Sequence, residues 1–351
     1  MVSTITLLTP KSNAHIFGHS QTQEMLIREF RAGRLAHGLI FSGVRGIGKA
    51  TLAYHFARML LSGREDMELP ETSPIFSRII ANSHTDLLVV EPAYDEKKDE
   101  YATEISAEIA REIPKFLSLT PAEGAWRVVI IDSADVLNDK SANAILKILE
   151  EPPKQTILIL IAHNVGRLLP TIRSRCRVVS LKPLSYEDFS QAVRLSVPDL
   201  YGEELAMLAV MSAHSVGVAL ELHAKGALKL YNETLDLIAS AQKLDNQAVL
   251  KFCEQIGSGK KAHGNWQLFM HVTLCILERI TKKSAGVEPQ KISDDETQKL
   301  QKIASLHNAE IWAEKWKQAG EEFQTAQKMH LDYKLVALVF FHSLMNEESY
   351  K

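Results

Sequence analysis

Short apolar runs alternate with helical patterns along the first half of the chain. The runs cover residues 38–41, 87–90, 127–131, 157–162 and 178–181. Between the first two runs, apolar side chains recur at the spacing of one helix face, at Leu52, Phe56, Met59 and Leu60. Strands that are apolar on both faces and separated by helices are typical of a parallel sheet covered on both sides. The pattern therefore predicts an α/β domain with a parallel sheet.

One helix of this half can be delimited from the sequence. Asn138 or Asp139 can cap its first turn, and Pro152 with Pro153 ends it, because proline cannot continue a helix. By contrast, the charged segment at residues 95–100 predicts a solvated loop.

The second half of the chain has a different pattern. Strand signals stop after Pro183, and residues 186–225 predict short helices with a break at Gly217. The remainder is almost entirely helical in pattern, with a polar stretch at residues 282–296 between two blocks. We therefore predict three domains, at residues 1–182, 183–225 and 226–351.

Two segments of the last domain are unusually apolar for surface helices. Residues 266–280 and 335–341 carry more apolar side chains than one narrow helix stripe needs. Helices that are apolar on more than one face are buried in a core or in an interface. An internal core accounts for most of these residues, and we expect the rest to contact another protein chain.

Composition limits how this chain can meet nucleic acid. Its 351 residues include 40 lysines and arginines and 43 aspartates and glutamates, so the formal net charge is −3. No global positive field is available for nonspecific DNA binding. Contact with DNA would need a partner or a local patch.

Cysteine usage and hydropathy point to the cytoplasm. Cys176, Cys253 and Cys275 form no Cys-x-x-Cys pair, so neither a zinc site nor a disulfide framework is expected. Scattered thiols fit a reducing compartment. Residues 1–10 lack the pattern of a signal peptide, and no stretch is long enough to cross a bilayer. We expect a cytoplasmic protein with no membrane partner and no bound metal.

A glycine-rich loop follows the first predicted strand and opens a helix. Its glycines are Gly43, Gly46 and Gly48, and Lys49 comes directly after them. In this context, glycines let backbone N–H groups surround phosphate oxygens, and the lysine reaches the outer phosphates. The alternative is a strand-to-helix turn without a ligand. ATP or ADP is the candidate cofactor, and the sequence leaves its binding open.

Two positions differ from those of a hydrolysing nucleotide site. Phosphate loops usually carry Ser or Thr after the lysine to hold magnesium, whereas this chain has Ala50. Thr51 is one residue late, roughly 100° further round the helix. The apolar run ending in Asp132 has the form of the second nucleotide motif, in which the carboxylate supports magnesium through water, or it caps the following turn. Ser133 follows it and cannot accept a proton from water at neutral pH.

Arginines are dense at residues 169–177, although the flanking positions are apolar. A guanidinium on a rigid element can enter a neighbouring subunit's nucleotide site and stabilise the transferring phosphoryl group. The alternative is that Arg175 pairs with a carboxylate of its own domain. Taken alone, the segment favours ordinary surface ion pairs. Its place after a phosphate loop and an acidic strand end favours the first interpretation.

In this order the motifs resemble those of bacterial clamp-loader AAA+ subunits of DNA polymerase III, and within them the delta-prime branch. The match is carried by residues 141–153, with the sequence SANAILKILEEPP, and by residues 169–176. Upstream, residues 16–19 and 37–41 also fit. The resemblance covers roughly residues 16–183 and is weak over the C-terminal half. It implies a phosphate-loop AAA+ domain, a small helical lid domain and an all-helical C-terminal collar that assembles with other subunits.

The resemblance also assigns roles to single residues. Asn164 falls at the sensor-1 position, where an amide can meet a γ-phosphate, although an Asn in a loop can equally cap a turn. Active subunits carry an arginine where Val218 stands. Arg175 corresponds to an arginine finger that acts in trans. Some relatives carry a zinc module that this chain lacks, because residues 62–84 contain no cysteine.

Ala50, Ser133 and Val218 all point to lost hydrolysis, whereas Arg175 is intact. We therefore expect a partner subunit that has neither ATPase nor polymerase activity and helps load a sliding clamp onto primed DNA. Its implied partners are the clamp-loader motor subunits and the delta subunit, with clamp and DNA reached through the complex. The alternatives are an ATP-hydrolysing motor subunit of the gamma/tau type, another AAA+ ATPase outside replication, and a plain nucleotide-binding regulator.

Overall fold

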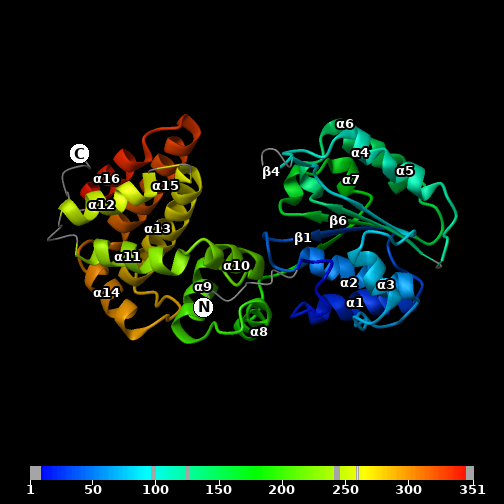
Figure 1. Cartoon of the computed structure of the whole chain (residues 1–351), viewed down its shortest axis with the longest axis horizontal. Coiled ribbons are helices and arrows are strands. Elements are labelled where there is room, and N and C mark those ends of the chain that lie inside the picture. The colour runs from blue at the N-terminus through cyan, green and yellow to red at the C-terminus, as the bar shows by residue number, and fades with distance from the viewer. Residues whose placement is uncertain are drawn as a thin grey trace. The chain divides into compact units, whose positions relative to one another are not determined.

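The computed structural model describes residues 9–95, 100–123, 126–240, 246–257, 259 and 261–344. The described chain forms two compact units (Figure 1). The first contains the residues up to Pro198 together with His214–Gly217, and the second contains Asp199–Ala213 and the residues from Val218 onward. The division into three domains at residues 182 and 225 stays a prediction. Most of the N-terminal segment 1–10, and residues 96–99 of the charged run, lie outside the described residues.

A five-stranded parallel sheet lies at the centre of the first unit, as the sequence predicts. In spatial order its strands are β2 (Leu87–Val90), β5 (Arg127–Asp132), β6 (Thr156–Ala162), β1 (Gly38–Ser42) and β7 (Arg177–Ser180). The three inner strands are buried along almost their whole length, which explains their continuous apolar sequence. Strand β7 departs from the expected full burial. It is an edge strand in which only Val179 is buried.

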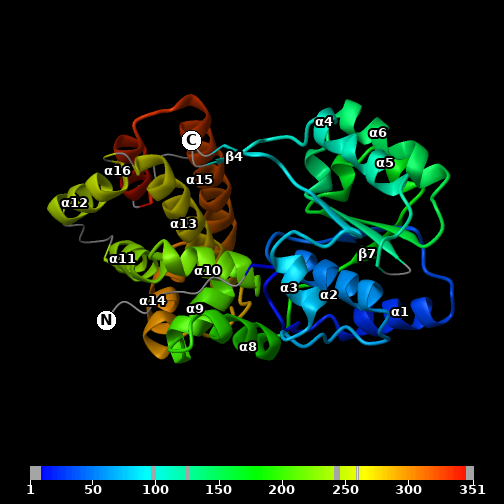
Figure 2. The same ribbon diagram turned by 45° about the vertical axis from the view of Figure 1, so that its right-hand side comes forward.

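Helices cover both faces of this sheet (Figures 1 and 2). One face packs against α1 (Ser20–Arg31), α2 (Lys49–Ser62) and α3 (Pro74–Ile80). The other packs against α4 (Ala107–Ala110), α5 (Glu112–Leu117), α6 (Asp139–Glu150) and α7 (Pro170–Arg173). Leu39 and Phe41 of β1 enter the first core, whereas Ile40 enters the second, as the alternation of a strand requires.

Local signals set the ends of these elements. Asn138 caps α6, because its side-chain oxygen accepts a hydrogen bond from the Ser141 N–H at 3.0 Å. The helix ends at Glu150, before the two prolines, as predicted. Short 3₁₀ turns follow the inner strands, at η1 (Ala134–Val136) and η2 (Val165–Arg167).

The charged segment at residues 95–100, expected to be a loop, begins and ends in short strands. Strand β3 (Tyr94–Asp95) pairs antiparallel with β4 (Glu100–Tyr101), so both described ends of the run lie in a small ladder. Its intervening residues are outside the described part of the chain.

The next segment forms α8 (Tyr186–Ser196), α9 (Gly202–Ser212) and α10 (Val216–Ala224). The expected break at Gly217 is wrong by a few residues, because Gly217 lies in the first turn of α10. The chain turns instead at Ala213 and His214, whose φ values are 48° and 60°. Left-handed backbone at two successive residues ends α9 without a glycine.

Further helices make the second unit, as the apolar pattern predicts: α11 (Ala227–Ala239), α12 (Asn246–Gly257), α13 (Ala262–Ser284), α14 (Asp294–Ala304), α15 (Ala309–Met329) and α16 (Tyr333–Ser343). Aromatic rings fill its core. Trp266 stacks on Tyr333 with ring centroids 4.8 Å apart and meets the Phe323 ring at 5.2 Å. Leu335 and Val339 on α16 are more than half exposed, so not all of the apolar surface is internal.

Within the described residues, no single helix is long and apolar enough to cross a membrane. Helices α9 and α10 are long and apolar enough only when taken together, and the chain bends by 117° between them.

A buried ion pair joins three helices of the second unit. Arg279 on α13 donates to both Glu296 oxygens, at 2.8 and 2.9 Å, and the Tyr231 hydroxyl donates to the same carboxylate at 2.8 Å. Both charged side chains are 5% exposed. Because removal of one partner leaves a buried charge unpaired, such pairs are sensitive to single substitutions.

We predict that Arg279→Met lowers the free energy of unfolding of the full chain by about 3–5 kcal/mol, measured by urea denaturation. The control is Glu278→Ala on the same helix, which breaks an exposed pair with Lys282 and should change stability by less than about 0.5 kcal/mol. If both substitutions lowered the free energy of unfolding equally, the buried pair would contribute no more to stability than the exposed one.

Candidate functional site

The glycine loop connects β1 to α2, which is the context that the sequence predicts. Its glycines have positive φ values, of 147° at Gly43, 80° at Gly46 and 98° at Gly48. Residues with a Cβ rarely adopt this backbone region. A Cβ at Gly43 would also lie 2.7 Å from the Leu181 carbonyl oxygen. The glycines are therefore required by the backbone shape of the loop.

Lys49 at the start of α2 turns back onto this loop. Its Nζ donates to the carbonyl oxygens of Gly43 and Val44, both at 2.7 Å, and the residue is only 3% exposed. Burial lowers the pKa of Lys49 to about 8, although the nearby carboxylates of Asp132 and Asp135 act in the opposite direction. The Lys49 amine is thus bound to the carbonyl groups of the glycine loop.

Carboxylates at the end of β5 have separate roles. Asp132 accepts a hydrogen bond from the Ser133 hydroxyl at 3.2 Å, and burial raises the pKa of its carboxyl group. Asp135 lies in η1, and it ties this turn to the segment after β6, because its Oδ2 accepts the backbone N–H groups of His163 and Asn164 at 3.2 and 3.1 Å. The sequence did not assign a role to Asp135 or His163, since this contact depends on the pairing of two distant strands.

Asn164 uses its side chain locally. Its amide oxygen accepts the Gly166 N–H at 2.9 Å and caps η2, which is the alternative that the sequence left open. At the start of α2, Ala50 packs against the buried core and Thr51 is half-buried in the first turn. Position 50 therefore supplies no hydroxyl group for a magnesium ion.

A second segment of the first unit lies directly on the loop. The Ser215 hydroxyl donates to the Arg45 carbonyl oxygen at 2.7 Å, and the Gly217 N–H donates to the Gly46 carbonyl oxygen at 2.9 Å. A Cβ at Gly217 would lie 2.9 Å from the Gly46 Cα, so any side chain there would force the segment to move. Val218, where active relatives carry an arginine, directly follows Gly217, and its role stays a prediction.

His19 supports the loop as well. One ring nitrogen, Nε2, lies 2.8 Å from the Ile47 carbonyl oxygen, and burial lowers the pKa of the imidazole. The sequence marked His19 only as part of a resemblance. Together with Ser215 and Gly217, it fixes the loop through the chain's own hydrogen bonds.

Arg175 lies between α7 and β7, on a different edge of the unit. Its Nη2 forms an ion pair with the Glu150 Oε1 at 2.8 Å. Its Nη1 donates to the Thr171 carbonyl oxygen at 2.9 Å and to the Ser174 hydroxyl oxygen at 3.3 Å. One third of the side chain is exposed. The expected alternative, a carboxylate partner in the same domain, is therefore present in the free chain.

The backbone beside Arg175 is fixed by close packing on Gly38, the first residue of β1. A Cβ at Gly38 would lie 2.7 Å from the Cys176 Sγ and 3.1 Å from the Leu149 Cδ2. The Leu149 carbonyl oxygen also lies 2.9 Å from the His37 Nε2. Burial raises the pKa of the Cys176 thiol to about 12, so the sulfur is a packing group.

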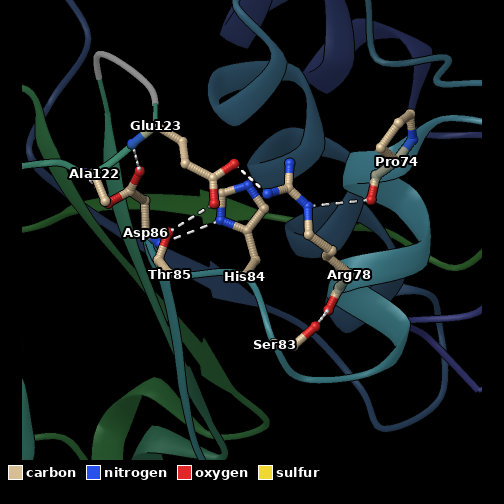
Figure 3. Close-up of polar contacts among 8 residues, drawn as sticks. All are labelled: Pro74, Arg78, Ser83, His84, Thr85, Asp86, Ala122 and Glu123. Carbon is tan, nitrogen blue, oxygen red and sulfur yellow. Dashed lines mark hydrogen bonds and ion pairs between the residues drawn. The ribbon is translucent and has the colours of Figure 1, made fainter.

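Polar contacts hold the cysteine-free segment before β2 (Figure 3). Asp86 is fully buried and accepts the N–H groups of Ala122 and Glu123 at 2.8 and 2.9 Å. Arg78 of α3 pairs with the Glu123 carboxylate, and the His84 Nδ1 accepts the Asp86 N–H at 3.2 Å. Among the described residues, no group of three or more His, Cys, Asp or Glu side chains is placed to hold a metal ion.

Several known proteins are similar to this chain. A family model described as "DNA polymerase III, delta subunit" matches residues 18–185. The delta-prime subunit of Pseudomonas aeruginosa is 33% identical over 221 residues, which cover 61% of this chain and 63% of that protein. The delta-prime subunit of Escherichia coli is 31% identical over 205 residues, covering 57% and 58%. By these matches the chain resembles subunits of the DNA polymerase III clamp loader. The resemblance seen in the motifs is thereby confirmed.

The match to the delta-prime relatives spans less than two thirds of their own length. A gamma subunit from Buchnera aphidicola is 29% identical over 314 residues, covering 86% of this chain and 80% of the relative. Among solved structures, a gamma subunit-related protein from Thermotoga maritima has a TM-score of 0.45 at 20% identity, covering 92% of this chain and 99% of that one.

We predict that Gly38→Ala destabilises the chain by about 1–3 kcal/mol, because the new methyl group would overlap Cys176 and press on Leu149. Thermal or urea unfolding measures the loss. Cys176→Ala removes the overlapping sulfur, so the double variant should be less destabilised than the sum of the two single variants. Strictly additive effects would contradict the packing described for Gly38.

A second prediction concerns Lys49 and pH. Its pKa of about 8 in the folded chain lies below the ordinary value of 10.5, so the unfolded chain binds the proton more tightly between these values. Stability of the native sequence should therefore rise relative to that of Lys49→Met as pH increases from about 7.5 to about 9.5. Urea titrations of both proteins at the two pH values measure this difference. The contributions of other titrating groups are the same in both proteins and cancel when the two stabilities are subtracted. An unchanged difference would show that the amine is not held as described.

Proposed function

We propose that this chain is the delta-prime-type subunit of its clamp loader, which completes a neighbouring ATP site and does not hydrolyse ATP itself. The observation that carries the proposal is the state of the phosphate loop. Its carbonyl groups are bound by Lys49, Ser215 and Gly217 of the same chain. The chain therefore keeps the loop in shape with its own side chains and backbone.

The chemistry of the loop supports the same conclusion. Ala50 offers no hydroxyl group to magnesium, and Ser133 replaces the carboxylate that would orient water. Val218 stands where active relatives carry an arginine that contacts a phosphate. Each such loss typically lowers a hydrolysis rate by orders of magnitude. Binding of ATP or ADP without turnover is compatible with the glycines of the loop.

Arg175 supports a role in trans. A guanidinium stays charged at all physiological pH values and presents donors in a planar fork that suits phosphoryl oxygens. In the pair with Glu150, one third of the Arg175 side chain and half of the Glu150 side chain are exposed, and exposed pairs contribute about 0–1 kcal/mol. A neighbour's γ-phosphate can therefore replace or join that contact at small energetic expense.

The proposed partners are the motor subunits and the delta subunit, with the sliding clamp and primed DNA bound through the complex in the cytoplasm. A net charge of −3 supports this indirect contact with DNA. The second unit offers apolar side chains for a collar, because Met329, Leu331, Leu335 and Val339 are exposed at the end of α15 and on α16.

A second candidate function is that of a motor subunit of the gamma/tau type. The gamma relative from Buchnera covers more of this chain than do the delta-prime relatives described above. That function would require turnover at the loop of this chain, against the absence of a hydroxyl group at Ala50.

Reconstitution with motor and delta subunits tests both functions. We predict that the isolated chain releases no phosphate from ATP above a buffer blank. In the complex, Arg175→Ala should remove the share of the DNA- and clamp-stimulated ATPase that the one neighbouring site contributes, since arginine fingers contribute about 10³–10⁵ in simpler switch proteins.

Size-exclusion chromatography and thermal unfolding are the controls. Arg175→Ala should assemble and unfold like the native chain. Turnover by the isolated chain that disappears in Lys49→Ala would favour the motor function. A variant that assembles poorly, with full ATPase in its assembled fraction, would make Arg175 a structural residue.

A further inference from the structure

We propose that Glu150 is a positioning residue for Arg175, holding the guanidinium in place before a neighbouring subunit arrives. This proposal rests on the trans-acting function of Arg175. Three contacts define the arrangement: the Glu150 Oε1 at 2.8 Å, the Thr171 carbonyl oxygen at 2.9 Å and the Ser174 hydroxyl oxygen at 3.3 Å. They come from the end of α6 and from the Arg175 segment itself.

The carboxylate stands on a firmly fixed helix end. Glu150 is the last residue of α6, and its neighbour Leu149 is buried against Gly38. Cys176, the neighbour of Arg175, packs against the same glycine. Gly38 therefore sets the separation of the two backbones that carry the ion pair. The two charged side chains meet because their buried neighbours share one contact point.

Donor counting indicates that this pair prepares Arg175 for another ligand. A guanidinium has five N–H donors, and the three contacts engage at most three of them. The others can still bind phosphoryl oxygens. A free arginine side chain samples many rotamers, and ordering it opposes binding. Glu150 and Thr171 restrict those rotamers in advance, while one third of the side chain stays exposed.

The opposite role would be competition, in which Glu150 draws Arg175 away from the neighbour's phosphate. A competitor should bind strongly and engage the donors that the ligand needs. The Glu150 side chain is instead half exposed and engages Nη2 alone, whereas both contacts of Nη1 come from the Arg175 segment. This geometry favours positioning over competition.

The test uses the reconstituted complex with Glu150→Ala, Glu150→Gln and the control Glu151→Gln, an exposed carboxylate at the next position. Glu150→Ala should lower kcat at the one neighbouring site about three- to tenfold, the size expected for re-ordering one long side chain, and the total stimulated ATPase should fall by the matching part of that site's share. KM for ATP should not change, because ATP is bound by the neighbour. Glu150→Gln, which keeps an acceptor, should restore part of the loss, and Glu151→Gln should match the native complex.

A double variant and a direct probe complete the experiment. Added to Arg175→Ala, Glu150→Ala should cause no further loss, because both act through one guanidinium. In the isolated chain, NMR of arginine Nε–H groups should show faster motion of Arg175 in Glu150→Ala than in the native chain.

The outcomes separate the two proposals. If Arg175→Ala lowers the ATPase and Glu150→Ala leaves it unchanged or raises it, the positioning role is wrong and the trans-acting function stands. Unchanged Arg175 mobility in Glu150→Ala likewise overturns positioning. If Arg175→Ala itself leaves the ATPase intact, the proposed function fails, and the role of Glu150 fails with it.

Discussion

The pairing of β1 between β6 and β7 determines where every candidate residue of the first unit lies. Ser42 pairs with Ala162 on one side and with Ser180 on the other, so these parallel strands end at the same edge of the sheet. Asp132 ends β5 beside Ile161 at that edge. Because the carboxyl ends of parallel strands converge, the glycine loop, Asp132 and Asn164 are brought together.

The opposite end of the same short strand supports a different site. Gly38 begins β1, and it is the residue on which Leu149 and Cys176 pack beside Arg175. At about 3.3 Å per residue, the five residues of β1 place this end only on the order of 15 Å from the glycine loop. One buried strand thus connects the loop of this subunit to the segment proposed to serve its neighbour.

The two ends differ in how their polar groups are satisfied. At the loop, Lys49, Ser215 and Gly217 bind backbone carbonyl groups inside the chain, and burial lowers the pKa of the Lys49 amine. At the other end, Arg175 is tied to an exposed carboxylate and keeps donors for further contacts. Buried contacts between fixed groups resist exchange, whereas exposed ion pairs exchange readily with other partners. This difference favours a subunit that acts through Arg175 on another chain.

Sequence alone determined the features that depend on local pattern. Continuous apolar runs specified a parallel sheet, Asn138 and the two prolines specified α6, and the spacing of glycines specified the loop between strand and helix. These signals reside within a few residues, so no tertiary information was needed. The pattern of apolar positions also separated the helical C-terminal half from the α/β half.

Only the tertiary structure decided which residues meet across the chain. Gly217 binds the loop at Gly46, Asp135 accepts the backbone N–H groups that follow β6, and Glu150 is the partner of Arg175. Each of these contacts joins positions far apart in sequence. Their distances are set by strand order and by close packing, neither of which is encoded in the spacing of any single motif.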